Sequence, residues 1–227
     1  TGTVAVGEPS VVVAVASPHR DAAFKAARFL IDEGELREQL DHIRTLSLTR
    51  GESTWMRGNT FYGQRQMFRP EFMEWFEGLR LPPYHLERRG DQYELTFEGK
   101  WHEVMLWEIP ALAVLMELRG RAVLDTMGRF ELQVLYARAM TRVWEKIEAL
   151  REIPDLSIAD FGTRRRFSRD WHEQVVATLA AQLPKSLRGT SNVRLAMQHN
   201  LVPIGTMAHE FIQAAQALGP RLAETQR

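Results

Sequence analysis

Hydrophobic and polar positions follow two different periods along this chain, and the changes of period predict its elements. Residues 11–15 form an unbroken run of Val and Ala, which is typical of a buried strand. Residues 21–46 repeat apolar side chains at helical spacing, and Gly34 is expected to break that helix. A further short helix is predicted to begin at Pro70, because proline suits a first helical turn.

The period then shortens to two residues. The stretches YHLERR and QYELTFEG alternate on either side of Gly90 and Asp91, which predicts a hairpin, and WHEVMLWEI is expected to add a third strand. Helical spacing returns at Pro110, and Gly128 is expected to divide residues 110–150 into two helices. Tryptophans in these apolar stretches are interpreted as core residues: Trp75, Trp101, Trp107 and Trp144.

After Pro154 short strands and helices alternate. Strands are predicted at 156–160 and 202–205, and helices at 168–183, 191–199 and 207–218, while 187–189 is too brief to assign alone. Strand, loop and helix in repeated succession are the signature of a parallel sheet or a βα barrel. The predicted fold class is therefore α/β, with an α+β N-terminal domain followed by the first part of a barrel.

Three loops at the predicted strand ends share a glycine followed by threonine, in FGTRRR, GTSN and GTMAHE. Ligands of parallel sheets gather at these carboxyl ends, and backbone N–H groups with hydroxyls at helix starts bind anions. The loops supply the candidate site residues, which are Phe161, Thr163, Arg164, Arg165, Thr190, Ser191, Asn192, Thr206, His209 and Glu210.

The arginine run at 164–166 has two interpretations. A guanidinium forms two-pronged bonds to carboxylate or phosphate, and the neighbouring Phe161 offers a flat surface for an aromatic ring, so the pair would suit an aromatic acid. A solvated charge run is the alternative. Likewise, Ser191 and Asn192 can cap a helix, line an anion pocket, or do both.

His209 and Glu210 follow the third loop. Histidine can act as a nucleophile toward a phosphoryl group, and the adjacent carboxylate favours function over a structural role. The remaining histidines have no such context and are interpreted as ordinary: His19, His42, His85, His102, His172 and His199. The motifs HExxH, GxxxxGK[ST] and GxGxxG are absent.

Composition narrows the class of protein. Acidic and basic residues balance at 29 each, so no general attraction to nucleic acid is indicated. There is no cysteine, which excludes disulfides and thiolate metal sites. No apolar run approaches the roughly 20 residues that span a bilayer, and the start lacks a basic leader, so a cytoplasmic protein without membrane contact is expected.

In their order and spacing, DFGTRRRFS, GTSNVRLA and PIGTMAHE resemble nicotinate phosphoribosyltransferase in its bacterial form. LREQLDHIRTL, GNTFYGQRQMFRPEF and LWEIPALAVLMELR are also similar to it, so the resemblance runs from about residue 31 to 227. It implies a type II phosphoribosyltransferase-like fold, with an irregular α/β barrel, and usually a homodimer. The implied reaction forms nicotinate mononucleotide and pyrophosphate from nicotinate and phosphoribosyl pyrophosphate in NAD salvage, with coupled ATP hydrolysis and Mg²⁺ accompanying these substrates.

The resemblance also implies roles for single residues. Phe161 would stack on the pyridine ring and Arg164 would lie at the nicotinate. Ser191 stands where nicotinamide-using relatives carry an aspartate, which implies an acid as substrate. His209 would be phosphorylated by ATP beside Glu210, and no protein ligand to a metal is expected. Phosphate or ribose contacts would come from Thr163, Arg165, Thr190, Asn192 and Thr206.

Residues 1–33 instead resemble the large subunit of molybdopterin synthase, in which an SPHR turn helps to form an anion pocket. The expected division of the chain is therefore 1–33, 34–153 and 154–227. The nicotinate phosphoribosyltransferase family is longer than this chain. The alternative function is thus a catalytically incomplete fragment or composite chain, acting at most as a ligand-binding or structural module, and the chain alone is expected to lack turnover.

Overall fold

The computed structural model describes residues 11–13, 31–61, 63–89, 92–207, 212–213 and 216. The predicted turn at Gly90 and Asp91 and the predicted helix 207–218 lie outside the described residues, apart from isolated positions of the latter.

An antiparallel sheet forms where the alternating stretches are found. Strands β4 (Tyr84–Arg89) and β5 (Gln92–Phe97) pair as the predicted hairpin. The third strand is β1 (Val11–Val13), which pairs with β5 so that the sheet order is β1-β5-β4.

The prediction of a third strand in WHEVMLWEI is wrong. This stretch forms α5 (Trp101–Val104) and the 3₁₀ turn η2 (Met105–Trp107), and then enters α6 (Glu108–Leu124). Val104 and Trp107 lie three residues apart and are both buried, whereas Trp101 and Met105 are exposed. The buried positions therefore follow the helical period, which the short apolar run concealed.

The main core lies between this sheet and two helices, α2 (Glu33–Thr45) and α6. Leu36 and Leu40 of α2 are fully buried against it, and Trp107 stacks on Phe97 with ring centroids 4.9 Å apart. The predicted break at Gly34 is not found, since the described helix begins at Glu33, and the predicted helical residues 21–30 lie outside the described residues. Gly34 lies in the first turn of α2.

Four further elements flank this core: α3 (Arg50–Gly58), the short strands β2 (Thr60–Phe61) and β3 (Arg65–Gln66), and α4 (Pro70–Gly78). The prediction of a helix start at Pro70 is confirmed. Gly128 precedes the long helix α7 (Arg129–Arg151), so the predicted division there is confirmed as well. Of the tryptophans interpreted as core, Trp107 is buried and Trp75 half-buried, but Trp101 and Trp144 are exposed because they lie on the outer faces of their helices.

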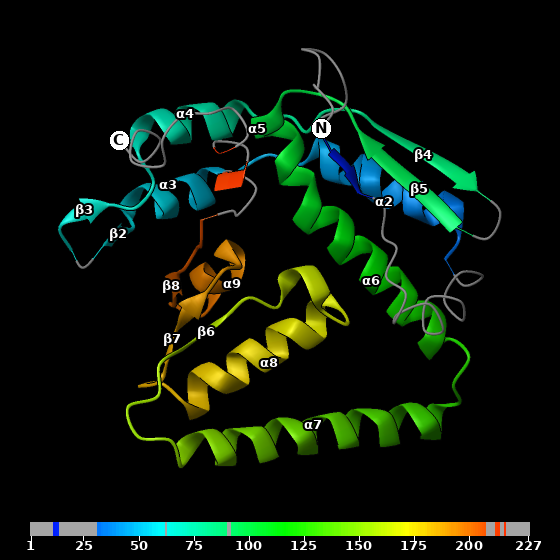
Figure 1. The fold of residues 1–227 in the computed structure, drawn as a ribbon. Coiled ribbons are helices and arrows are strands. Elements are labelled where there is room, and N and C mark those ends of the chain that lie inside the picture. Colours follow the sequence, from blue (N-terminus) through cyan, green and yellow to red (C-terminus); the bar gives the residue numbers. More distant parts are fainter. Residues whose placement is uncertain are drawn as a thin grey trace.

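The end of the described chain has the predicted α/β character. Strands β6 (Ile158–Asp160), β7 (Leu187–Thr190) and β8 (Val202–Pro203) form a parallel sheet in the order β6-β7-β8. Helix α8 (Arg169–Gln182) connects the first two strands and α9 (Val193–Gln198) the last two. In Figure 1, α7 runs alongside α8, and α6 separates α8 from α2.

One glycine of the loop motifs has a packing role. Gly189 and Thr190 lie inside β7 rather than in the loop after it, contrary to the prediction. A Cβ at Gly189 would lie 2.0 Å from the carbonyl oxygen of Val202. The close approach of β8 therefore excludes any side chain at this position.

Candidate functional site

The carboxyl ends of the three parallel strands meet at one edge of the sheet. Asp160 is in register with Thr190, and the N–H of Ser191 donates to the carbonyl of Asp160 at 2.8 Å. The N–H of Ile204 donates to the carbonyl of Thr190 at 2.9 Å. The three loops that carry the candidate residues therefore leave the sheet side by side.

The first and second loops contact each other directly. The side-chain amide of Asn192 donates to the hydroxyl oxygen of Thr163 at 3.0 Å. The backbone N–H of Asn192 donates to the hydroxyl of Thr190 at 3.1 Å, and its side-chain oxygen caps α9 by accepting from Leu195. The predicted role of Asn192 as a helix cap is therefore confirmed, while its role in an anion pocket stays a prediction, and Thr190 is fully buried beneath the loop surface.

A buried acid lies directly under these loops. The Oδ2 atom of Asp160 lies 3.0 Å from Nε2 of His172 and accepts a hydrogen bond from the Thr190 hydroxyl at 2.6 Å. Its Oδ1 atom accepts from the N–H of Gly162 at 3.0 Å. Burial opposes ionisation of this carboxyl, but the hydrogen bonds from His172, Thr190 and Gly162 outweigh it and lower the pKa of Asp160.

Neither Asp160 nor His172 was predicted as a site residue. His172 is only 5% exposed and comes from α8, which covers the sheet. A Cβ at Gly162 would lie 2.9 Å from both Asp160 Oδ1 and His172 Nε2, so any side chain at this position would displace the Asp160–His172 pair. The acid at the end of a predicted strand was the available signal, because a carboxylate buried there needs donors.

Neither sequence interpretation of the arginine run describes it fully. Arg164 forms an ion pair with Glu108, and Arg166 forms one with Glu117 at 3.1 Å. Both carboxylates belong to α6, so two of the three arginines bind another part of the chain. Arg165 is exposed, and its side chain has no hydrogen-bond or ion-pair partner within the described part of the chain.

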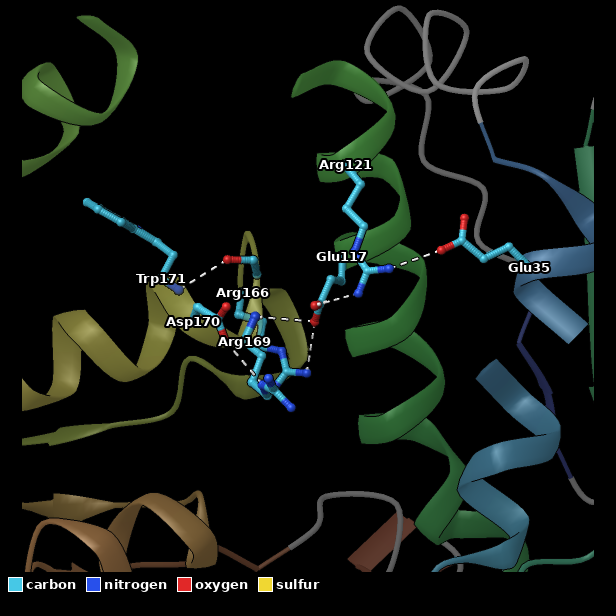
Figure 2. Close-up of polar contacts among 8 residues, drawn as sticks. Glu35, Glu117, Arg121, Arg166, Arg169, Asp170 and Trp171 are labelled. Carbon is cyan, nitrogen blue, oxygen red and sulfur yellow. Dashed lines mark hydrogen bonds and ion pairs between the residues drawn. The ribbon is translucent and has the colours of Figure 1, made fainter. Parts of the chain in front are cut away.

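Glu117 is the centre of a network that fixes the loop after β6 (Figure 2). Besides Arg166, its carboxylate accepts from the N–H of Arg169 at 3.2 Å and pairs with Arg121 at 3.2 Å. Arg121 in turn pairs with Glu35 of α2 at 3.0 Å. Because the side chains of Glu117 and Arg166 are only 19% and 17% exposed, this contact is shielded from solvent.

The remaining candidate residues differ in their placement. Phe161 is 47% exposed, and Thr206 is exposed. His209 and Glu210 lie outside the described residues. The first two loops therefore contact each other, while the end of the third loop that carries His209 and Glu210 lies outside the described residues.

A cavity of about 1250 Å³ lies between the β2–β3 hairpin and the strands β7 and β8. Ser191 and Gly205 line it from the second and third loops, Phe61 lines it from the hairpin, and Phe68 lines it from the segment between β3 and α4. Its volume is sufficient for a small organic ligand. Of the candidate side chains, Ser191 faces this cavity, whereas Phe161 and Arg164 are not in its lining.

Two observations concern other kinds of site. Within the described ranges, no group of three or more His, Asp or Glu side chains is arranged to hold a metal ion. None of the helices searched in those same ranges has the length and apolarity that crossing a membrane requires.

Comparison with known protein families shows which family contains this sheet and its loops. Residues 7–116 match the N-terminal domain of nicotinate phosphoribosyltransferases, and residues 156–227 match the nicotinate phosphoribosyltransferase family itself. The chain belongs to the nicotinate phosphoribosyltransferase family. The N-terminal match begins at residue 7 and therefore includes most of the segment 1–33. The resemblance of that segment to molybdopterin synthase stays a prediction. The division of the chain into 1–33, 34–153 and 154–227 also stays a prediction.

Solved structures agree with the family. The chain is similar to a nicotinate phosphoribosyltransferase from Vibrio cholerae, with 25% identity and a TM-score of 0.66 over 90% of this chain, and to one from Porphyromonas gingivalis, with 27% identity and a TM-score of 0.62 over 87%. A structure from Saccharomyces cerevisiae is similar in fold, with 22% identity and a TM-score of 0.64 over 93% of this chain. The match covers 58% of the length of the yeast protein. The chain spans 46% of the length of each of the two bacterial nicotinate phosphoribosyltransferases.

Proposed function

We propose that this chain carries the nicotinate-binding edge of a nicotinate phosphoribosyltransferase, which joins nicotinate to phosphoribosyl pyrophosphate and releases pyrophosphate. The observation that carries this proposal is the contact between Asn192 and Thr163, which joins two of the family-like loop motifs at one edge of the parallel sheet. Family membership supplies the reaction class. In that reaction the ring nitrogen of nicotinate bonds to the ribose carbon from which pyrophosphate departs.

The polar groups of this edge suit an acid rather than an amide. Ser191 faces the cavity without a negative charge that would repel a carboxylate. Arg164 and its partner Glu108 are 41% and 39% exposed, so the guanidinium keeps free donors toward solvent. A nicotinate carboxylate could therefore bind Arg164 alongside Glu108 or in its place, with Phe161 as the flat surface for the ring.

The phosphate-binding part of the proposal rests on the loop motifs. Exposed Arg165 and Thr206 are available to phosphate groups, as are the backbone N–H groups at the start of α9 after Asn192. Mg²⁺ would enter with phosphoribosyl pyrophosphate and ATP. His209 is proposed to accept the terminal phosphoryl group of ATP as ADP leaves, with Glu210 beside it. A homodimer is proposed for the active protein.

A second candidate function is a ligand-binding module without turnover. The parallel sheet has three strands in the described residues and ends at β8, where Val202 is 50% exposed. Pyrophosphate departure needs preorganised donors on several sides, and this edge of the sheet supplies them from one side. The chain alone is therefore expected to bind nicotinate but not to form nicotinate mononucleotide.

Calorimetry and an assay test the two candidates together. Arg164→Ala should weaken nicotinate binding by about 2–5 kcal/mol, toward the low end because the pair is half exposed. Arg151→Ala on α7, which removes another surface ion pair, is the matched control and should leave binding unchanged.

The assay combines the chain with nicotinate, phosphoribosyl pyrophosphate, Mg²⁺ and ATP. Binding without product supports the module, and product formation supports the enzyme. Equal affinity of Arg164→Ala and the native chain would remove Arg164 from the site. Absence of any nicotinate binding by the folded native chain would contradict both candidates.

A further inference from the structure

We propose that Asp160 and His172 form a positioning pair that holds Thr163 and Asn192 in the geometry that binds the ligand. The ligand part of this inference rests on the proposed function, whereas the effect on loop geometry does not. His172 is assigned as a positioning residue, because it is buried beneath the loops and contacts Asp160 rather than the cavity.

The contacts form one continuous path. His172 Nε2 meets Asp160 Oδ2, which also accepts from the hydroxyl of Thr190. The oxygen of that hydroxyl accepts the backbone N–H of Asn192, whose side-chain amide donates to Thr163. Each step is a hydrogen bond of 2.6–3.1 Å, so the path joins a helix behind the sheet to both ligand loops.

A second branch reaches the first loop directly. Asp160 Oδ1 accepts from the N–H of Gly162, the residue before Thr163. The Asp160 carboxylate is 12% exposed and binds donors from the loop after β6, from β7 and from α8 at once. All of its partners except His172 therefore belong to the strand ends and loops that carry the candidate site.

The contact with an ionised carboxylate determines which ring nitrogen of His172 carries a proton. An ionised carboxylate can only accept, so Nε2 of His172 must carry the proton that it shares with Asp160. Its other ring nitrogen, Nδ1, is buried and has no hydrogen-bond partner in the described residues. Within the described residues, the imidazole of His172 therefore makes its polar contact with Asp160 alone.

Removal of His172 would leave Asp160 buried with one donor fewer, and unsatisfied buried groups are costly. The carboxylate would then turn toward water or toward its remaining donors, Thr190 and Gly162. Either movement shifts the two loops. A glutamine at 172 can restore the missing donor with its side-chain amide, whereas an alanine cannot.

The experiment compares His172→Ala and His172→Gln with Val176→Ala, all in the full chain. Val176 lies one turn further along α8 and is fully buried, so its truncation weakens the same helix packing without touching Asp160. Amide hydrogen exchange is read for residues 161–164 and 190–192, and nicotinate affinity by calorimetry. His172→Ala should raise loop exchange and weaken nicotinate binding by about tenfold each, and His172→Gln should restore most of both.

Val176→Ala should lower the melting temperature while leaving loop exchange and affinity near native values. The proposal is overturned if Val176→Ala opens the loops as much as His172→Ala, or if the glutamine variant behaves as the alanine variant does. Thr190→Val, which removes the other donor to Asp160 Oδ2 at nearly constant shape, gives a second test and should open the same loops. If the native chain binds no nicotinate, the proposed function fails, while the exchange comparison still decides the positioning role.

Discussion

The antiparallel sheet β1-β5-β4 buries apolar side chains, whereas the parallel sheet β6-β7-β8 buries polar ones at its carboxyl edge. In the first, Leu36 and Trp107 pack onto the sheet without exposed surface. In the second, Thr190 and His172 are 0% and 5% exposed, and both bind the carboxylate of Asp160.

The difference separates what stabilises the fold from what shapes the site. Apolar burial is non-directional, so the first sheet contributes stability without specifying the direction of any polar atom. A buried hydrogen-bond network adds little net stability but fixes atoms in place, and it is costly when one member is lost. Substitutions in the two sheets should therefore differ in their ratio of lost stability to lost binding.

Trp107→Ala should cause the largest loss of stability. Trp107 is fully buried, stacks on Phe97, and donates from its indole N–H to the carbonyl of Pro82 at 3.0 Å. Its truncation should lower the free energy of unfolding by about 3–5 kcal/mol in urea denaturation. In the folded fraction, hydrogen exchange of residues 161–164 should stay native. A specific opening of that loop would show that the antiparallel sheet also shapes the site.

Glu117→Ala should have the next largest effect. The change leaves Arg166 largely buried without its partner and also removes the acceptor of the Arg169 N–H, so a loss of about 1–3 kcal/mol is expected. Glu35→Gln is the matched control, because it alters an exposed member of the same network and should stay within about 0.5 kcal/mol of native. Equal losses in the two variants would show that the burial of the Arg166 contact has no consequence.

Thr49→Ala should cost about 1 kcal/mol, because Thr49 caps α3 and exchanges hydrogen bonds with Glu52. Thr54→Ala in the same helix removes a hydroxyl that is bonded only to the preceding turn, so it should be neutral or slightly stabilising. Thermal unfolding of both variants checks this, and a similar loss in both would refute the capping role.

A further prediction concerns the titration of Asp160. Since its pKa in the folded chain is lowered, its ionised form contributes stability above the unfolded-state pKa near 4, and this contribution is lost as the pH falls through the lower folded-state value. The stability of the native chain should therefore fall more steeply below about pH 4 than that of Asp160→Asn. If the stability of the two proteins falls equally steeply below pH 4, the partners of Asp160 do not stabilise its ionised form.

The sequence predicted elements whose signals are local. The hairpin followed from strict alternation, and the division at Gly128 and the helix start at Pro70 followed from helix-breaking and helix-starting residues. Residues 101–109 were misjudged because an apolar run of that length has no clear period until a partner surface selects the buried positions.

The candidate site was predicted only where its signals lie close together in the sequence. The loop motifs were visible in the sequence, and the meeting of Thr163 with Asn192 agrees with them. The partners of the arginine run were not visible, because Glu108 and Glu117 precede Arg164 and Arg166 by about fifty residues in an unrelated helix. His172 was overlooked because its significance depends on the packing of α8 over Asp160.

The proposed function requires that the carboxyl edge of β6, β7 and β8 binds nicotinate as an acid. Its most direct test is a titration of the ¹⁵N-labelled chain with nicotinate, followed by amide chemical shifts, with nicotinamide as the matched ligand. We expect shifts concentrated at residues 161–165, 190–192 and 204–206, clearly larger with nicotinate than with nicotinamide, and reduced in Arg164→Ala. Shifts confined to other parts of the chain, or equal responses to the acid and the amide, would contradict it.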